Sequence, residues 1–141
     1  MPPFARLVIP ELLREEVIAD ARSEQPLECC GLLAGHIAEG IGTVTMRFPV
    51  RNDAASSTEY FSNPRDMLTA FRTMRERGLE LLAIYHSHPT SEALPSRRDI
   101  ERNTYGETAA HLIVSLAAEP VVRAWWLTES EYREVECLSR Q

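Results

Sequence analysis

The sequence predicts a mixed α/β fold in a single domain spanning residues 1–141. Short apolar runs typical of strands alternate along the chain with two longer segments whose apolar residues recur at helical spacing. A length of 141 residues suits one domain with a substantial core. No internal repeat, linker or low-complexity tract divides the chain.

The first quarter of the chain is expected to form a strand and a helix. Residues 6–9 are a short apolar run, which is typical of a strand. A helix that begins at Pro10 or Glu11 follows, and its apolar positions share one face: Leu13, Val17 and Ala21. Pro26 prevents its continuation, because proline lacks the N–H that a helix interior needs.

A hairpin is expected next. Cys29–Leu33 and Thr43–Val50 are the strand candidates, joined by a turn at Glu39-Gly40. The polar run 51–58 is expected to be a loop, and residues 59–61 a short edge strand.

A second helix should begin after Asn63, a good N-cap residue, with Pro64 in its first position. Its buried stripe is expected to consist of Met67, Phe71 and Met74. Gly78 closes this helix.

The remaining elements are predicted in the order strand, loop, helix and three strands. Residues 81–85 are apolar and branched, which indicates a buried strand that continues to His88. The loop 90–95 leads to a third helix from Ser96 to about Tyr105. The closing strands are expected at residues 111–116, 121–128 and 132–138.

Side-chain alternation along these strands also predicts which of several residues lie in the core. Trp125 and Trp126 must face opposite sides, so we expect one in the core and the other at a contact surface. By the same argument one of Cys29 and Cys30 should be a small core residue. His111 begins an apolar strand and is expected to be structural.

Composition excludes several functions and predicts a cytoplasmic protein. A net charge of −6 argues against a broad nucleic-acid surface. The N-terminus lacks the pattern of a signal peptide, and no apolar run approaches the length of a membrane span. Three cysteines do not make a disulfide framework. All 15 basic residues are arginine, which excludes a Schiff-base, pyridoxal-phosphate or P-loop lysine.

The chemistry is expected around His86, His88 and Asp99. Alternate residues of a strand face the same side, so the two imidazoles point together. Two histidines and a nearby carboxylate are the ligand set of a catalytic zinc with an open fourth position. Other interpretations remain open, because strand histidines are often ordinary core residues. Ser96 and Asp99 also fit the N-cap and third position of a helix start.

With Glu28 added, the pattern resembles the JAMM, or MPN-plus, metallopeptidase family. That family shows a distant glutamate, then His-x-His, seven residues, Ser, two residues and Asp, and every position is filled here. The resemblance implies an MPN (cytidine-deaminase-like) fold with a curved mixed sheet flanked by helices. It also implies one zinc on His86, His88 and Asp99, with Glu28 as general base and acid and Ser96 as the residue that stabilises the oxyanion.

The resemblance further implies the substrate class. The chain is similar to the compact prokaryotic members, because His111 follows Asp99 within a dozen residues and leaves no room for a long insertion. We therefore expect zinc-dependent hydrolysis after the C-terminal glycine pair of a ubiquitin-fold, sulfur-carrier-type protein. The carrier, the leaving group and the oligomeric state, a homodimer included, stay open.

Arg97 and Arg98 depart from the small or uncharged residues expected between the serine and the aspartate. They are either a solvated helix start or a receptor for a carboxylate near the metal. Three other functions are weighed. A catalytically inactive MPN scaffold is disfavoured because no ligand is missing, and a zinc deaminase because its Pro-Cys-x-x-Cys signature is absent. A cysteine hydrolase that uses Cys29 or Cys30 is allowed by composition.

Overall fold

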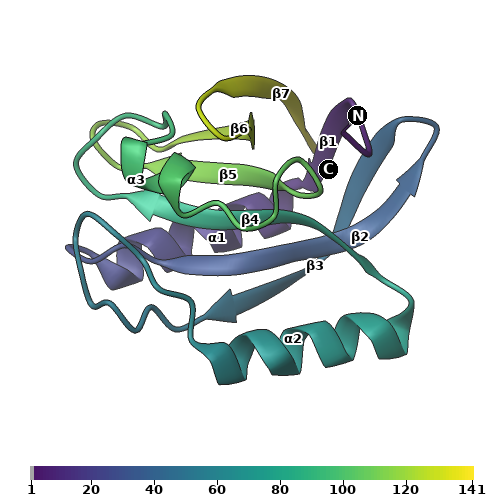
Figure 1. The fold of residues 1–141 in the computed structure, drawn as a ribbon, viewed down its shortest axis with the longest axis horizontal. Coiled ribbons are helices and arrows are strands. Elements are labelled where there is room, and N and C mark those ends of the chain that lie inside the picture. The colour runs from purple at the N-terminus through teal and green to yellow at the C-terminus, as the bar shows by residue number, and fades with distance from the viewer. Residues whose placement is uncertain (1) are drawn as a thin grey trace.

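The computed structural model describes residues 2–141, and within them seven strands form one strongly curved mixed sheet. The strand order is β1-β3-β2-β4-β5-β6-β7, and the sheet closes on itself because β1 also pairs in parallel with β7 (Figure 1). The strands are β1 (Arg6–Pro10), β2 (Cys30–Ala38), β3 (Ile41–Val50), β4 (Glu80–His88), β5 (Ala110–Ser115), β6 (Val121–Leu127) and β7 (Tyr132–Arg140). The expected mixed α/β fold with a curved, helix-flanked sheet is confirmed.

Two long helices cover opposite faces of the sheet. Helix α1 (Glu11–Glu24) lies against β1, β3, β4, β5 and β7, so it fills the concave side (Figure 1). Helix α2 (Pro64–Arg77) packs on the other face against β3 and β4. Alternation along β2 shows both faces, since Leu33 packs with the α1 core and Leu32 with the α2 core.

Most of the local structure follows the predicted signals. The hairpin turn lies at Glu39 and Gly40, which both have positive φ angles, of 51° and 78°. Helix α2 begins after Asn63, whose Oδ1 accepts a hydrogen bond from the Asp66 N–H at 3.0 Å. It ends at Gly78, which is left-handed.

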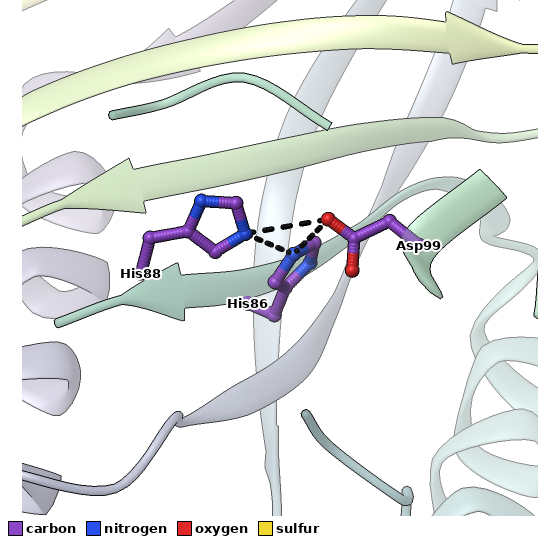
Figure 2. A group of neighbouring side chains, drawn as sticks. All are labelled: His86, His88 and Asp99. Carbon is purple, nitrogen blue, oxygen red and sulfur yellow. Dashed lines mark hydrogen bonds and ion pairs between the residues drawn. The ribbon is translucent and has the colours of Figure 1, made fainter. Parts of the chain in front are cut away.

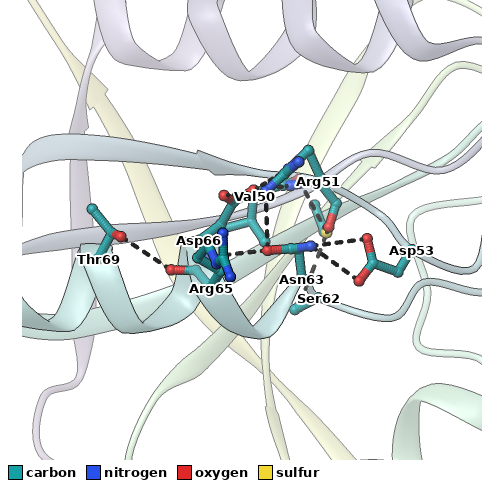
Figure 3. A network of polar contacts seen from close by, with 9 residues as sticks. Val50, Arg51, Asp53, Ser62, Asn63, Arg65, Asp66 and Thr69 are labelled. Atoms are coloured by element: carbon teal, nitrogen blue, oxygen red, sulfur yellow. Dashed lines mark hydrogen bonds and ion pairs between the residues drawn. The ribbon is translucent and has the colours of Figure 1, made fainter.

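A polar network anchors the loop before α2 to the start of that helix (Figure 3). The Asn63 side-chain amide donates to both carboxylate oxygens of Asp53 at 3.1 Å. Arg51 pairs with Asp66 through its backbone N–H and its guanidinium. The loop is therefore tied down at both ends.

Three predictions of local structure were wrong. Residues 59–61 form no strand; the nearest strand-like pairing is an isolated bridge between Asn52 and Ser62. The third helix, α3, is only Arg97–Glu101 and ends well before Tyr105. Neither Trp125 nor Trp126 lies at a contact surface; both are buried, because the sheet is covered on both faces. Cys29 is a small core residue, as expected of one of the two cysteines, and Cys30 is buried as well.

No helix among residues 2–141 is long and apolar enough to cross a membrane.

Candidate metal centre and active site

Strand β4 carries two histidines on one face at its C-terminal end. β4 is an interior strand, paired with β2 on one side and β5 on the other. His86 is fully buried and His88 is 4% exposed. Ser87 faces the opposite side, where its Oγ accepts a hydrogen bond from the Cys29 N–H at 2.8 Å. The predicted alternation is therefore present.

Tyr85 holds β4 from the concave side. Its hydroxyl donates to Asp20 of α1 at 2.7 Å and accepts from Arg47 of β3 at 3.0 Å. Its ring lies directly over Gly31 of β2, where a Cβ would overlap it. These contacts fix the strand immediately before His86.

Asp99 reaches the two histidines from the first turn of α3. Its Oδ2 lies 3.2 Å from His86 Nε2 and 3.3 Å from His88 Nε2 (Figure 2). The two Nε2 atoms are themselves 3.2 Å apart. Burial disfavours the charged carboxylate, but the two histidines and the Ser96 N–H outweigh it and hold the pKa of Asp99 well below its usual range.

The three facing atoms have the spacing of a metal site. A tetrahedral zinc with bonds of about 2.0–2.1 Å keeps its ligand atoms about 3.3 Å apart. The three distances here are 3.2, 3.2 and 3.3 Å. Two imidazole nitrogens and one carboxylate oxygen also match the donor set of catalytic zinc sites. The residues present therefore fit such an ion.

A further contact orients His88. Its Nδ1 lies 2.7 Å from the backbone carbonyl oxygen of Glu92, which accepts the Nδ1 proton. Its Nε2 is then left with a lone pair directed toward the cluster. Ligand histidines usually have such a partner, because it fixes their tautomer.

The Ser96–Asp99 pair forms a capping box at the start of α3. The Asp99 N–H donates to Ser96 Oγ at 3.0 Å, and the Ser96 N–H donates to Asp99 Oδ2 at 2.8 Å. The Ser96 hydroxyl is the acceptor in this contact, so its own proton remains available to another group.

Glu28 is a buried carboxylate immediately before β2. It is 3% exposed, and its Oε1 has no hydrogen-bond partner among the described residues. Burial raises its pKa to about 8; the charges of His88 and Asp99 also act on it, in opposite directions. An unpartnered carboxylate that titrates near neutral pH is suited to taking up and releasing a proton.

A pocket of about 520 Å³ adjoins Asp99. Aromatic and aliphatic side chains form much of its wall, including Tyr60, Phe61, Met67 and Tyr105. Arg98 and Arg102 line it as well, and both form ion pairs with Glu59, at 3.1 and 2.9 Å. Arg97 does not line the pocket: its side chain is 93% exposed and lies 3.4 Å from Glu101. The structure thus separates the two arginines.

Sequence reasoning missed part of this environment. His111, expected to be structural, is buried in the pocket wall with Nε2 3.2 Å from Asn103 Oδ1. Glu59, Tyr60 and Arg102 were not predicted as site residues. The only local signal was an aromatic pair, Tyr60-Phe61, after a polar loop.

The pKa values of the two cysteines that follow Glu28 are shifted away from those of a catalytic nucleophile. Burial raises the pKa of both Cys29 and Cys30 to about 12. A nucleophilic cysteine needs a lowered pKa, because the thiolate is the reactive form. This environment weighs against the cysteine hydrolase.

Comparisons with known proteins show which family the chain resembles. The family model described as prokaryotic homologs of the JAB domain matches residues 10–128. The CysO-cysteine peptidase of Mycobacterium tuberculosis is 35% identical over 114 residues, covering 81% of this chain and 75% of the relative. The desampylase of Haloferax volcanii is 31% identical over 136 residues, covering 93% of this chain and 94% of the relative. A solution structure from Desulfitobacterium hafniense superposes with a TM-score of 0.88 at 31% identity, covering 96% and 93% of the two chains.

Proposed function

The chain belongs to the prokaryotic homologs of the JAB domain, and from this premise we propose that it is a zinc-dependent hydrolase of ubiquitin-fold protein conjugates. The bond cleaved is the amide or isopeptide bond after the C-terminal glycine pair of a sulfur-carrier-type protein. The names of two relatives support this class, since one is a CysO-cysteine peptidase and the other a desampylase. In this proposal residues 1–141 are one metallopeptidase domain of a cytoplasmic enzyme.

One observation carries the proposal: the ligand atoms of His86, His88 and Asp99 converge. The buried carboxylate of Glu28, whose Oε1 has no hydrogen-bond partner among residues 2–141, feels the charges of His88 and Asp99. His86, His88 and Asp99 would hold one zinc per chain. When bound, zinc polarises a carbonyl and lowers the pKa of a coordinated water to about 7. Strand β4 pairs with β2 on one side and β5 on the other, and this pairing keeps the two imidazoles in place for the ion.

Glu28 is the proton carrier in this mechanism. Its carboxylate takes the proton of the attacking water and delivers it to the nitrogen of the leaving group, so the C–N bond breaks without a free amide anion. The buried, unpartnered Oε1 supports this role, because no group among residues 2–141 competes for the proton that it takes up.

Ser96 stabilises the oxygen of the scissile carbonyl as negative charge develops on it. Its Oγ already accepts the Asp99 N–H, so its own proton is available to donate to that oxygen. The capping box holds this hydroxyl next to the ligand aspartate.

Arg98 is the better of the two arginine candidates for substrate binding. It lines the pocket beside Asp99, whereas Arg97 is exposed on the outer side of α3. A leaving group with a free carboxylate would place that charge near the cleaved bond. Arg98 can receive it while it keeps Glu59, since a guanidinium has five N–H donors.

The experiment that tests this function uses purified protein stripped of metal and reloaded with zinc. The substrates are a ubiquitin-fold carrier ending in Gly-Gly, joined by an amide bond to an amino acid or to a lysine side chain. Mass spectrometry should find the free carrier ending at the second glycine, only with the zinc-loaded protein. Activity that survives chelation but is lost on thiol alkylation would instead favour the cysteine hydrolase. A zinc-loaded protein that binds such carriers without cleaving them would favour the scaffold.

A further inference from the structure

The two candidate ligand histidines are oriented by different means. His88 has the Glu92 carbonyl on its Nδ1, 2.7 Å away. The Nδ1 of His86 is buried and has no hydrogen-bond partner within residues 2–141. The polar contacts of His86 are therefore confined to Nε2, the atom that faces the cluster, and no hydrogen bond at Nδ1 orients the ring from behind. This ring is nevertheless the more deeply buried of the two.

An aromatic ring instead packs on the face of this imidazole. The Tyr60 ring stacks on the His86 imidazole with centroids 4.7 Å apart and planes inclined by 25°. This is the offset-stacked geometry in which aromatic pairs attract beyond their buried area. Rotation of the His86 ring about its Cβ–Cγ bond would break this contact.

The side chain of Asn52 fixes the backbone on both sides of Tyr60. Its amide nitrogen donates to the Glu59 carbonyl at 3.2 Å, and its Oδ1 accepts from the Phe61 N–H at 2.8 Å. The same amide nitrogen donates to the Glu28 carbonyl at 3.0 Å. One side chain thus links the backbone on both sides of Tyr60 to the backbone of Glu28, the proposed proton carrier.

From these contacts we propose that Tyr60 is a positioning residue for His86: its ring sets the imidazole angle that a metal ion requires, and Asn52 holds it there. The proposal rests on the proposed function only in taking His86 as a metal ligand. Contacts behind ligand histidines typically change metal affinity by about 10–100-fold, and a stacked ring belongs at the low end of that range.

The test compares Tyr60→Leu, which removes the ring, with Tyr60→Phe, which keeps it. Phe61→Leu is the matched control, because Phe61 is the neighbouring ring in the same loop but is 58% exposed. Zinc affinity is measured by competition with a chromophoric chelator. The visible spectrum of the Co²⁺-substituted protein reports the ligand geometry, which a loss of folding stability alone would not shift.

We expect Tyr60→Leu to weaken zinc binding about tenfold and to shift the Co²⁺ absorption bands. Tyr60→Phe and Phe61→Leu should stay within about twofold of wild type. Asn52→Ala, which leaves both rings intact, should weaken zinc in the same direction and keeps the proposal testable if Tyr60→Leu does not fold.

Wild-type affinity and spectrum in Tyr60→Leu would overturn the proposal, as would an equal loss in Phe61→Leu. If the wild-type protein binds neither zinc nor Co²⁺, the assignment of the metal centre fails first. Metal binding is measured without substrate, so it does not depend on which conjugate is cleaved.

Discussion

The Asp99 carboxylate and the Ser96 backbone are joined by a hydrogen bond at the same oxygen that faces the two histidines. Asp99 Oδ2 accepts the Ser96 N–H at 2.8 Å and lies 3.2 Å from His86 Nε2. One side-chain atom therefore both caps a helix N-terminus and completes the His86–His88–Asp99 cluster. The helix-cap interpretation and the proposed ligand role of Asp99 are compatible, because the same oxygen serves both.

Substitution of Asp99 should separate its two contributions. Asp99→Asn keeps an oxygen for the Ser96 N–H but removes the charge, whereas Asp99→Ala removes both. We expect both variants to lose stoichiometric zinc, as His88→Ala should, because the carboxylate oxygen is one of the three clustered candidate ligand atoms. In metal-free protein, Asp99→Ala should be less stable than Asp99→Asn by about 1 kcal/mol, a typical cap contribution.

Metal analysis and urea unfolding of the same preparations measure the two effects. Full zinc in both the His88→Ala and Asp99→Ala variants would rule out this ligand assignment. Equal stability of the two Asp99 variants would show that the cap contributes nothing.

The Glu28→Gln variant tests the proton carrier. Glutamine has nearly the same shape but cannot take up a proton from water, so hydrolysis should fall by about 10²–10⁴-fold or more. Zinc content and the circular dichroism spectrum should be unchanged, because Glu28 is not among the three clustered ligand groups. Near wild-type turnover would remove Glu28 from the mechanism.

The sequence predicted which side chains cluster at the C-terminal end of β4 far better than it predicted their surroundings. His86 and His88 follow from the two-residue period of a strand, and Ser96 and Asp99 from helix-start chemistry, which are both local rules. The contact between Tyr60 and His86 joins residues far apart in the chain, and no local pattern encodes it. Residues 59–61 were predicted as a short edge strand. Their backbone groups instead bond to the Asn52 side chain and to the Asp53 N–H, contacts that no local pattern encodes.

The pH dependence of stability should reveal the buried Glu28 in metal-free protein. Its pKa is about 8 in the folded protein against an ordinary value of 4.5. Between these values the folded state holds a proton that the unfolded state has released, so stability falls as pH rises from about 4.5 to 8. Glu28→Gln removes this loss.

The variant should therefore match wild type near pH 4 and exceed it near pH 8. Each pKa unit corresponds to about 1.4 kcal/mol, so we expect a difference on the order of 4 kcal/mol near pH 8. Urea unfolding of both proteins across this range, with chelator present, measures it. A difference that is constant with pH would mean that Glu28 is not protonated in the fold.

The different surroundings of Arg97 and Arg98 lead to the last prediction. Both precede the ligand aspartate, but Arg98 lines the pocket next to Asp99 and lies 3.1 Å from Glu59. The side chain of Arg97 is 93% exposed and points to Glu101. If the leaving group is a free amino acid, its α-carboxylate lies close to the cleaved bond. The Arg98 guanidinium, in the adjoining pocket wall, could then bind that carboxylate.

A charge-assisted hydrogen bond is worth about 1.5–3 kcal/mol, or roughly tenfold to a hundredfold in specificity. Arg98→Gln should therefore lower kcat/KM by that factor for a carrier–amino-acid adduct and much less for the adduct with the amino-acid amide. Arg97→Gln, the matched control one residue away, should leave the ratio of the two rates unchanged. Equal losses on both adducts in Arg98→Gln would mean that this arginine orients the carrier or the loop, because only a contact with the carboxylate distinguishes the two leaving groups.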